Sequence, residues 1–544
     1  MTAPWLSVYA ALIAGASAYF LWKRLHRYLR YFQQEEYDGR RLVRWYLEKR
    51  AFDRRGSTVA AGGLVLSGIS HWLLLFAGQT LASLGLCWIA RSEENPVGHG
   101  KIRLNLTARA RRIRNWSFGL LVAGLLLMQA IALLTPYPLA WMWFFQIVLL
   151  QACPFALIAG NWLLRPFERR EQDRYLQEAN ETFRRLRPYT IGITGSYGKT
   201  STKVLLSQIM DQALAPTFTT PKSINTLMGI TREIRERLTP AHRYAVIEMG
   251  AYNRGSIQRL CALTPPDAAI VTVVGLMHLE RFGSQENIVL AKSELAQAVP
   301  EAGVLVCNGD NEGARRIAEM YPKATTLFYG SDVSRGAIDC RIGHMETTPQ
   351  GTGFSFVWRG ETYQGFTPQL GRPALENLAA AFTMACALGA DPQYVLAIAR
   401  NLKPEKNRLE PTRQGKAVVL NDAYNSNPVG FQSALEVFAA MPGQRRFLVT
   451  PGMVELGPVQ ADENRKIARQ AAGVCDQVYL VGDVNRAAWE QGLREGGLPE
   501  GQVHCFPHRD LALAQLFGAE TNLGEDVILI ENDLPDLYEG SVRF

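Results

Sequence analysis

A glycine-rich turn organises this chain: Thr194-Gly195-Ser196-Tyr197-Gly198-Lys199-Thr200-Ser201. A short apolar segment, residues 190–194, precedes the turn, and a helical pattern begins near Thr202. Glycine lets backbone N–H groups approach a phosphate closely, and a helix N-terminus favours the negative charge. A strict P-loop has another glycine five residues before Gly198, where this chain has Ile193. The order strand, turn, helix predicts a phosphate-binding site built from Gly195 to Ser201.

The turn also supplies candidate ligands for a nucleotide and its metal. Lys199 is placed to reach the β- and γ-phosphates, and the Thr200 hydroxyl is placed to bind Mg²⁺. A Walker-type NTPase uses a carboxylate at the end of a neighbouring strand as a further metal ligand. Glu248 follows the apolar segment 244–247 and occupies such a place. We therefore expect ATP and Mg²⁺ at this site.

Two sets of alternating strand and helix patterns surround the turn. The first includes β-rich runs at residues 190–194, 244–249, 268–274 and 304–308. The second, at residues 417–420, 446–450, 477–481 and 527–530, is Rossmann-like but lacks the GxGxxG turn of a dinucleotide site. Such alternation predicts βαβ units and largely parallel sheets. The fold class is therefore α/β, with a central ATP-binding domain at 188–403 and a C-terminal domain at 404–544.

The N-terminal third has a different character. Apolar runs cover residues 5–22, 58–90, 116–135 and 139–164. The first spans roughly 27 Å as a helix, just enough to cross the hydrocarbon of a membrane. A cleaved signal peptide and buried soluble helices are the alternatives. We expect a transmembrane helical module at 1–165, in which residues 58–90 form one tilted span or a hairpin, and a charged linker helix at 166–187.

The net charge of +8 is concentrated beside these apolar runs. Eleven basic residues lie between Lys23 and Arg55, and seven between Arg91 and Arg114. Basic loops next to membrane spans indicate the cytoplasmic side and contact anionic lipids, so this charge predicts membrane lipids, not nucleic acid, as partners. The eight cysteines are scattered without a CxxC pair, which excludes a zinc spacing and suits a reducing cytosol.

Further motifs follow the turn and Glu248 in a fixed order. Taken alone, a histidine after a strand is more often a structural residue than a metal ligand, and a lysine in a helix is usually a solvated charge. The order of these motifs after the turn and Glu248 is what makes them candidates. The motifs are His278-Leu-Glu-Arg-Phe-Gly-Ser, Ala-Lys292-Ser-Glu, Asn377-Leu-Ala-Ala, Asn-Arg408-Leu-Glu, Asn-Asp422-Ala-Tyr-Asn425-Ser-Asn-Pro and Met453-Val-Glu-Leu-Gly. Over residues 188 to 540 this series resembles the Mur ligase family, and most closely the member that adds D-alanyl-D-alanine to a muramyl tripeptide.

The resemblance implies a role for each metal-site residue. Lys199 and Thr200 would hold the ATP phosphates and Mg²⁺, and Glu248 would be a metal ligand. His278 would help to hold a second Mg²⁺. Lys292 matches a lysine that becomes carbamylated in the family, which would turn a cation into an anionic ligand.

The resemblance also assigns the nucleotide-side residues. Asn377 lies where the family contacts adenine. Arg408 would reach the ATP phosphates from the hinge, and Asp422 would contact the ribose. Asn425 belongs to the same loop as Asp422.

The activity implied by the resemblance is ADP-forming amide ligation in peptidoglycan-type precursor synthesis. A carboxylate acceptor would be activated by ATP as an acyl-phosphate and then attacked by the amine of an amino acid or dipeptide. With the apolar runs, this implies a multi-pass protein of the bacterial inner membrane whose ligase domains face the cytoplasm.

Three departures from the family pattern affect the substrates. Residues 1–165 stand where the family has its UDP-sugar domain, so a lipid-linked or membrane-proximal acceptor becomes a reasonable hypothesis. Pro373-Ala374 replace the usual His-Asn on the adenine side, so some adenine contacts must differ. Glu531-Asn532-Asp533 replace a late Lys-Gly-Ser signature that helps the family to read the amine.

Two other functions remain open from the sequence. A poly-γ-glutamate synthetase has a Mur-like ATPase, lacks the UDP-sugar domain and is membrane-associated. A catalytically degenerate membrane scaffold would turn over no ATP with any acceptor. The motifs around Glu248, Asn425 and Glu455 favour the cell-wall type of ligase over the first, and the retained lysines and carboxylates argue against the second.

Overall fold

A computed structural model describes residues 3–93, 95–98, 103–275, 282–323, 325–403, 406–424, 426–518 and 523–534 of the chain. The chain divides into two compact units, one up to residue 171 and one at residues 172–533. The division falls within the longest helix, α6, which runs from Pro138 to Leu186.

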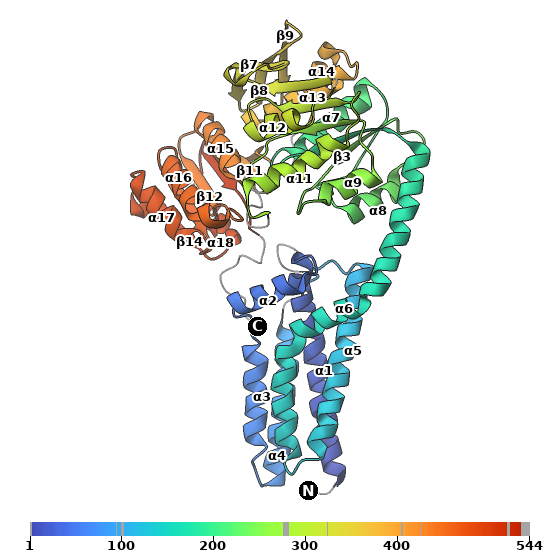
Figure 1. Cartoon of the computed structure of the whole chain (residues 1–544). Helices are drawn as coiled ribbons and strands as arrows, with labels where there is room; N and C mark the ends of the chain where they lie inside the picture. Colours follow the sequence, from blue (N-terminus) through green and yellow to red (C-terminus); the bar gives the residue numbers. More distant parts are fainter. Residues whose placement is uncertain are drawn as a thin grey trace. The chain divides into compact units, whose positions relative to one another are not determined.

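The first unit is helical (Figure 1). Besides α6 it contains α1 (Ala3–Gln34), α2 (Gly39–Glu48), α3 (Arg54–Leu66), α4 (Trp72–Ser92) and α5 (Ala108–Leu133). Among the described residues, four helices are long and apolar enough to cross a membrane: α1 from Leu6, α4, α5 and α6.

The apolar run at residues 58–90 is a helical hairpin. Its two helices, α3 and α4, pack against each other in opposite directions. A Cβ on Gly78, early in α4, would lie 3.3 Å from Leu66 at the end of α3, and a Cβ on Gly85, later in α4, would lie 3.3 Å from Val59 nearer the start of α3. Small residues let helices approach closely in this way. With 13 residues, α3 reaches only about 20 Å, which is shorter than the hydrocarbon core. Of the two arrangements that the sequence allowed, the structure therefore has the hairpin.

Arg24 lies at the centre of a buried ionic cluster in this unit. Its Nε lies 2.7 Å from Asp53 Oδ2 and its Nη2 lies 2.7 Å from Glu93 Oε1. Arg27 Nη1 approaches the same Glu93 oxygen at 3.3 Å. The Arg24 and Asp53 side chains are fully buried, so the cluster ties α1 to the start of α3 and the end of α4 through charges that are largely removed from water.

The expected span at 139–164 and the linker at 166–187 form one continuous helix, α6. Pro154 and Pro166 lie inside it, and each removes one backbone hydrogen bond of the helix. The last turns of α6 belong to the second unit, where Ala179 and Phe183 are buried in the core of the central domain.

The central domain is built on a nine-stranded sheet in the order β2-β3-β1-β4-β5-β6-β7-β8-β9. The first six strands are parallel: β1 (Tyr189–Thr194), β2 (Thr217–Thr219), β3 (Tyr244–Glu248), β4 (Ala268–Val271), β5 (Val304–Asn308) and β6 (Thr325–Gly330). They continue into an antiparallel meander of β7 (Cys340–Thr348), β8 (Gly351–Trp358) and β9 (Glu361–Thr367).

Helices cover both faces of the central sheet (Figure 1). Side chains alternate between the faces along each strand, so Val246 packs in one core while Ala245 and Ile247 pack in the other. One core includes α7 (Lys199–Ala213), α13 (Arg372–Ala387) and α14 (Pro392–Ala399). The other includes α8 (Leu227–Arg237), α9 (Ser256–Leu263), α11 (Gln285–Ala298) and α12 (Glu312–Met320).

The C-terminal domain has a six-stranded sheet in the order β10-β11-β15-β12-β13-β14, which is parallel except for the β10–β11 hairpin. Its strands are β10 (Glu410–Gln414), β11 (Ala417–Asp422), β12 (Arg446–Thr450), β13 (Gln477–Val481), β14 (Val503–Phe506) and β15 (Val527–Glu531). Its helices are α15 (Pro428–Ala440), α16 (Gln460–Ala472), α17 (Arg486–Glu495) and α18 (Arg509–Leu516). The α/β fold class and the apolar N-terminal helices are confirmed.

Candidate active site

The turn between β1 and α7 has a backbone geometry that requires glycine. Gly198 has a φ of 82° and Gly195 one of 154°. A Cβ on Gly198 would collide with Asn377 Oδ1, and one on Gly195 would collide with Thr272 Oγ1. The glycines therefore let Asn377 and Thr272 pack directly against the turn, and α7 begins at Lys199 immediately after it.

The loop after β4 holds the turn in place. The Ser196 N–H donates to the Val273 carbonyl oxygen at 2.6 Å. The Thr272 hydroxyl donates to the Tyr197 carbonyl oxygen, also at 2.6 Å. These two hydrogen bonds fix the backbone of the turn against the loop after β4.

Glu248 ends β3 beside the turn, because β3 is the neighbour of β1 and Glu248 lies opposite Ile193. The Thr200 hydroxyl donates to Glu248 Oε2 at 2.9 Å, and Asn225 Nδ2 donates to Oε1 at 2.8 Å. Lys203 Nζ lies 3.4 Å from Oε2, and Glu248 is only 1% exposed. Carboxylate and hydroxyl oxygens are ligands that Mg²⁺ prefers, so Thr200 and Glu248 fit a magnesium site.

Lys199 and Lys292 both turn toward the backbone of the turn. Lys199 Nζ donates to the carbonyl oxygens of Gly195 at 2.8 Å and Ser196 at 3.0 Å. Lys292, on α11, donates to the same Gly195 oxygen at 2.8 Å. Burial lowers the pKa of Lys199. Burial and then the Lys199 charge lower the pKa of Lys292 to well below its ordinary value. As an ammonium, Lys292 offers no atom to a metal.

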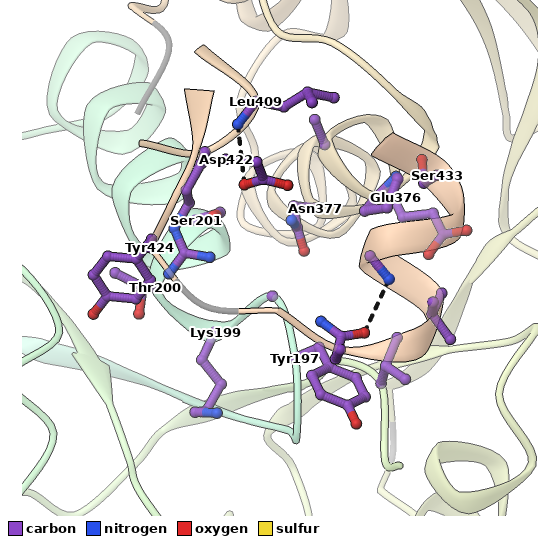
Figure 2. Close-up of a pocket in the computed structure, with 18 of the residues that line it drawn as sticks. Tyr197, Lys199, Thr200, Ser201, Glu376, Asn377, Leu409, Asp422, Tyr424 and Ser433 are labelled. Atoms are coloured by element: carbon purple, nitrogen blue, oxygen red, sulfur yellow. Dashed lines mark hydrogen bonds between the residues drawn. The ribbon is translucent and has the colours of Figure 1, made fainter. Parts of the chain in front are cut away.

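The opposite side of the site comes from α13 and from the C-terminal domain (Figure 2). Asn377 Oδ1 accepts a hydrogen bond from the Thr202 hydroxyl at 3.1 Å. The Arg408 guanidinium stacks 4.3 Å from the centre of the Tyr424 ring. Asp422, the last residue of β11, accepts the Leu409 N–H at 3.1 Å. Central and C-terminal residues thus meet around one opening.

That opening is a cavity of about 630 Å³. Ten of the predicted site residues line it: Ser196, Tyr197, Gly198, Lys199, Thr200, Ser201, Glu248, Asn377, Arg408 and Asp422. Gly195 and Lys292 are not among the lining residues. They are joined to each other by the hydrogen bond from Lys292 Nζ to the Gly195 carbonyl oxygen. His278 and Asn425 lie outside the described residues. A volume of this size accommodates a nucleotide.

Three further residues of the site carried no prediction of a role. Lys203 pairs with Glu248, and its position four residues after Lys199 is the signal that would have placed both on one side of α7. Asn225 comes from a loop with no motif to mark it. Glu531 lines the cavity beside Asp422, whereas the sequence marked it only as a departure from the family pattern.

Comparison with known families matches both domains. Residues 193–385 match the Mur ligase middle domain, and residues 407–531 match the Mur ligase, glutamate ligase domain. Together the two matches cover more than half of the chain and leave out the apolar N-terminal helices.

Individual relatives agree with these matches. The UDP-N-acetylmuramoyl-tripeptide–D-alanyl-D-alanine ligase of Escherichia coli strain K12 is 33% identical over 313 residues, which are 55% of this chain and 65% of that protein. The ligase of the same name from Bacillus subtilis strain 168 is 28% identical, over 59% of this chain and 67% of that protein. The chain thus spans just under two thirds of the length of the Escherichia coli relative.

Solved structures share the fold. MurF ligase from Thermotoga maritima in complex with ADP is 25% identical with a TM-score of 0.57, covering 66% of this chain and 80% of that one. MurF from Acinetobacter baumannii has a TM-score of 0.59 at 24% identity, covering 66% of this chain and 77% of that one. Through its middle and C-terminal domains, the chain belongs to the Mur ligase family.

Proposed function

We propose that the chain is a membrane-anchored, ATP-dependent and ADP-forming ligase that joins a carboxylate to an amine in peptidoglycan-type precursor synthesis. The supporting observation is a single cavity in which Lys199 and the Thr200–Glu248 pair meet Arg408 and Asp422 from the other domain. The named activity of the relatives and the ADP in the Thermotoga maritima structure support the same assignment.

The first step is transfer of the γ-phosphoryl group of ATP to the acceptor carboxylate. A carboxylate oxygen forms a bond to the γ-phosphorus while the bond to the bridging oxygen of the β-phosphate breaks, giving an acyl-phosphate and ADP. Lys199, Arg408 and the N-terminus of α7 would balance the charge that develops on the phosphate oxygens.

The second step forms the amide. The amine nitrogen attacks the acyl carbon, the carbon–oxygen bond to phosphate breaks, and the nitrogen loses a proton. Both domains contribute to the cavity wall, so approach of the two domains over the substrates would exclude the water that hydrolyses an acyl-phosphate.

Two Mg²⁺ sites belong to the proposal. Thr200 and Glu248 would hold the first ion, and His278 together with Lys292 would serve the second. Bound Mg²⁺ neutralises phosphate charge and orients the phosphates for transfer. Burial lowers the pKa of Lys292 and so favours its uncharged amine form, which is the form that reacts with CO₂. Attack of that nitrogen on the carbon of CO₂ with loss of a proton gives a carbamate, whose oxygens are suitable ligands.

Four apolar helices support anchoring in a membrane. Between α1 and the body of α3, Arg40, Arg44 and Arg50 are exposed. Exposed arginines beside a span favour the cytoplasmic side and contact anionic lipid headgroups. We place the protein in the bacterial inner membrane, as a multi-pass protein with its ligase domains in the cytoplasm.

The acceptor is proposed to be lipid-linked or otherwise held near the membrane. Four apolar helices precede the ATP-binding domain in this chain, and they favour an acceptor that is itself held at a membrane. The amine is proposed to be an amino acid or a dipeptide such as D-alanyl-D-alanine, by analogy with the named relatives.

The test is amine-dependent phosphate release by the detergent-purified full chain. The panel combines lipid-linked and soluble UDP-linked muramyl peptides with D-alanyl-D-alanine and glutamate. Release with the lipid-linked acceptor and the dipeptide supports the proposal. Release only with a soluble UDP-linked acceptor removes the lipid-linked hypothesis. Release with glutamate alone indicates a poly-γ-glutamate synthetase, and no release with any pair indicates a degenerate scaffold.

A further inference from the structure

Two carboxyl side chains meet at the C-terminal end of the second sheet. β11 and β15 are parallel neighbours, and their last residues, Asp422 and Glu531, are register partners. Partners in adjacent strands project from the same face of a sheet. Both residues line the cavity of the proposed active site. The pair therefore faces the nucleotide side of the site from within the C-terminal domain.

Hydrogen bonds hold each carboxyl in a defined orientation. The Ser426 hydroxyl donates to Glu531 Oε1 at 2.7 Å. The Leu409 N–H donates to Asp422 Oδ1 of the carboxyl group at 3.1 Å. The Asn532 N–H donates to the main-chain carbonyl oxygen of Asp422 at 3.1 Å, which fixes the backbone at this position. Glu531 is 1% exposed, so water does not solvate its charge. Each carboxyl thus has one protein donor, while the buried Glu531 Oε2 receives no hydrogen bond from the described residues.

Two carboxyls that are register partners in adjacent strands resist ionising together, because the charge of each disfavours the charge of the other. Burial raises the pKa of Asp422 to about 6. Burial, followed by the Asp422 charge, raises the pKa of Glu531 to well above its ordinary value. Of the two carboxyls, Glu531 is therefore the one that keeps its proton to higher pH, and in that form it can donate a hydrogen bond to the Asp422 carboxylate.

Two other sets of charged groups lie at this edge of the sheet, and neither takes the proton from Glu531. The Arg408 guanidinium lies on the hinge, where it stacks on the Tyr424 ring, and its charge favours ionised Asp422. Past the end of β15, Asp533 pairs with Arg509 at 2.7 Å. A positive charge thus favours the ionised state of Asp422, while Glu531 is the member of the pair that holds the proton.

We propose that Glu531 is a positioning residue for the nucleotide: as a neutral acid it donates to Asp422 and holds that carboxylate ready to accept hydrogen bonds from the ribose hydroxyls. This inference rests on the proposed function and on the ribose contact that the resemblance to the Mur ligases implies for Asp422. It also gives a role to the departure from the family's Lys-Gly-Ser signature, because Glu531 stands in this chain where that signature has its lysine.

A pH dependence of nucleotide affinity follows from this role. At acid pH Asp422 gains a proton and becomes a weaker acceptor for the ribose. At alkaline pH Glu531 loses its proton, so two like charges repel each other and the orientation of Asp422 is lost. Nucleotide affinity should therefore be highest between these limits and fall on both sides.

The test is direct binding of a fluorescent ADP analogue with Mg²⁺ to the detergent-purified full chain across a pH series. Glu531→Gln keeps a donor that cannot ionise, so its affinity should match the unaltered protein at neutral pH and stay constant at alkaline pH. Glu531→Leu removes the donor and should weaken binding roughly ten- to a hundredfold at neutral pH. It should raise KM for ATP more than it lowers kcat.

Glu525→Gln is the matched control, because Glu525 is exposed just before β15 begins and should leave the profile unchanged. Thermal unfolding of each variant checks that its fold is intact. If Glu531→Gln loses affinity at alkaline pH just as the unaltered protein does, or if a folded Glu531→Leu binds normally, the inference is overturned. If the unaltered protein binds no nucleotide at any pH, the proposed function itself fails.

Discussion

Lys199 and Lys292 donate to the same acceptor, the carbonyl oxygen of Gly195, and each nitrogen lies 2.8 Å from it. Two ammonium groups on one oxygen repel each other, and burial removes the water that would screen them. Lys292 is the one whose pKa falls well below the ordinary range. This side chain is therefore predisposed to give up its proton and to react as an amine.

Lys292 should make the proposed activity depend on CO₂. Because the amine form reacts with CO₂ to give an anionic carbamate, depleting bicarbonate should slow amine-dependent phosphate release, and adding bicarbonate should restore it. Lys292→Ala should lose activity by about a hundredfold or more, whereas Lys416→Ala, in an exposed hairpin turn, should not. Full activity in CO₂-free buffer would remove the carbamate from the proposal.

Lys203 should be essential for stability because it neutralises Glu248. Its buried ammonium lies 3.4 Å from Glu248 Oε2 and also donates to the Lys222 carbonyl oxygen. Lys203→Met leaves a buried carboxylate without its cation, which should cost about 3–5 kcal/mol of unfolding free energy. A double variant, Lys203→Met with Glu248→Gln, should lose much less than the sum of the two single variants. Additive losses, measured by denaturant unfolding, would show that the pair is not coupled.

Much of the central site could be predicted because its parts are local in the sequence. A strand, a glycine turn and a helix occupy consecutive residues, and Glu248 marks the end of the strand that pairs with β1. The contact between Glu531 and Asp422 could not be predicted in this way. These residues are 109 positions apart, and they meet only because β15 inserts between β11 and β12 in the sheet.

The N-terminal helices show a similar limit. An apolar run such as 58–90 has no periodicity that distinguishes one tilted helix from two short ones, and only the break between Leu66 and Trp72 separates α3 from α4. The β7–β9 meander was also not predicted, because β7 and β9 are largely exposed and lack the continuous apolar character of the central parallel strands.

The stability of the C-terminal domain should fall as the pH rises. Folding raises the pKa of Asp422 from an unfolded value of about 4 to about 6, and it raises the pKa of Glu531 further above its ordinary value. Such a raised pKa contributes stability that is fully present below the unfolded pKa and is lost as pH rises through the folded pKa. The melting temperature should therefore decrease as the pH rises from about 4 through about 6, and less steeply in Asp422→Asn. Equal slopes for the two proteins would contradict the pKa assignment.

Arg24 should be required for the helical unit to stay folded. Arg24→Met would leave Asp53 and Glu93 buried without their main cation, and such a loss costs about 3–5 kcal/mol. Arg44→Gln changes an exposed arginine of the same unit and is the control. Thermal unfolding in detergent, followed by tryptophan fluorescence, should show a large decrease only for Arg24→Met. Equal melting temperatures would mean that the cluster contributes no net stability.

The most direct measurement is ATP-dependent phosphate release by the purified full chain, compared with Lys199→Ala, in the presence of a carboxylate acceptor and an amine. We expect release that requires all three substrates and falls to background in Lys199→Ala, because that ammonium lies in the turn that would hold the phosphates. Unchanged release by Lys199→Ala would show that ATP reacts elsewhere and would contradict the proposed site.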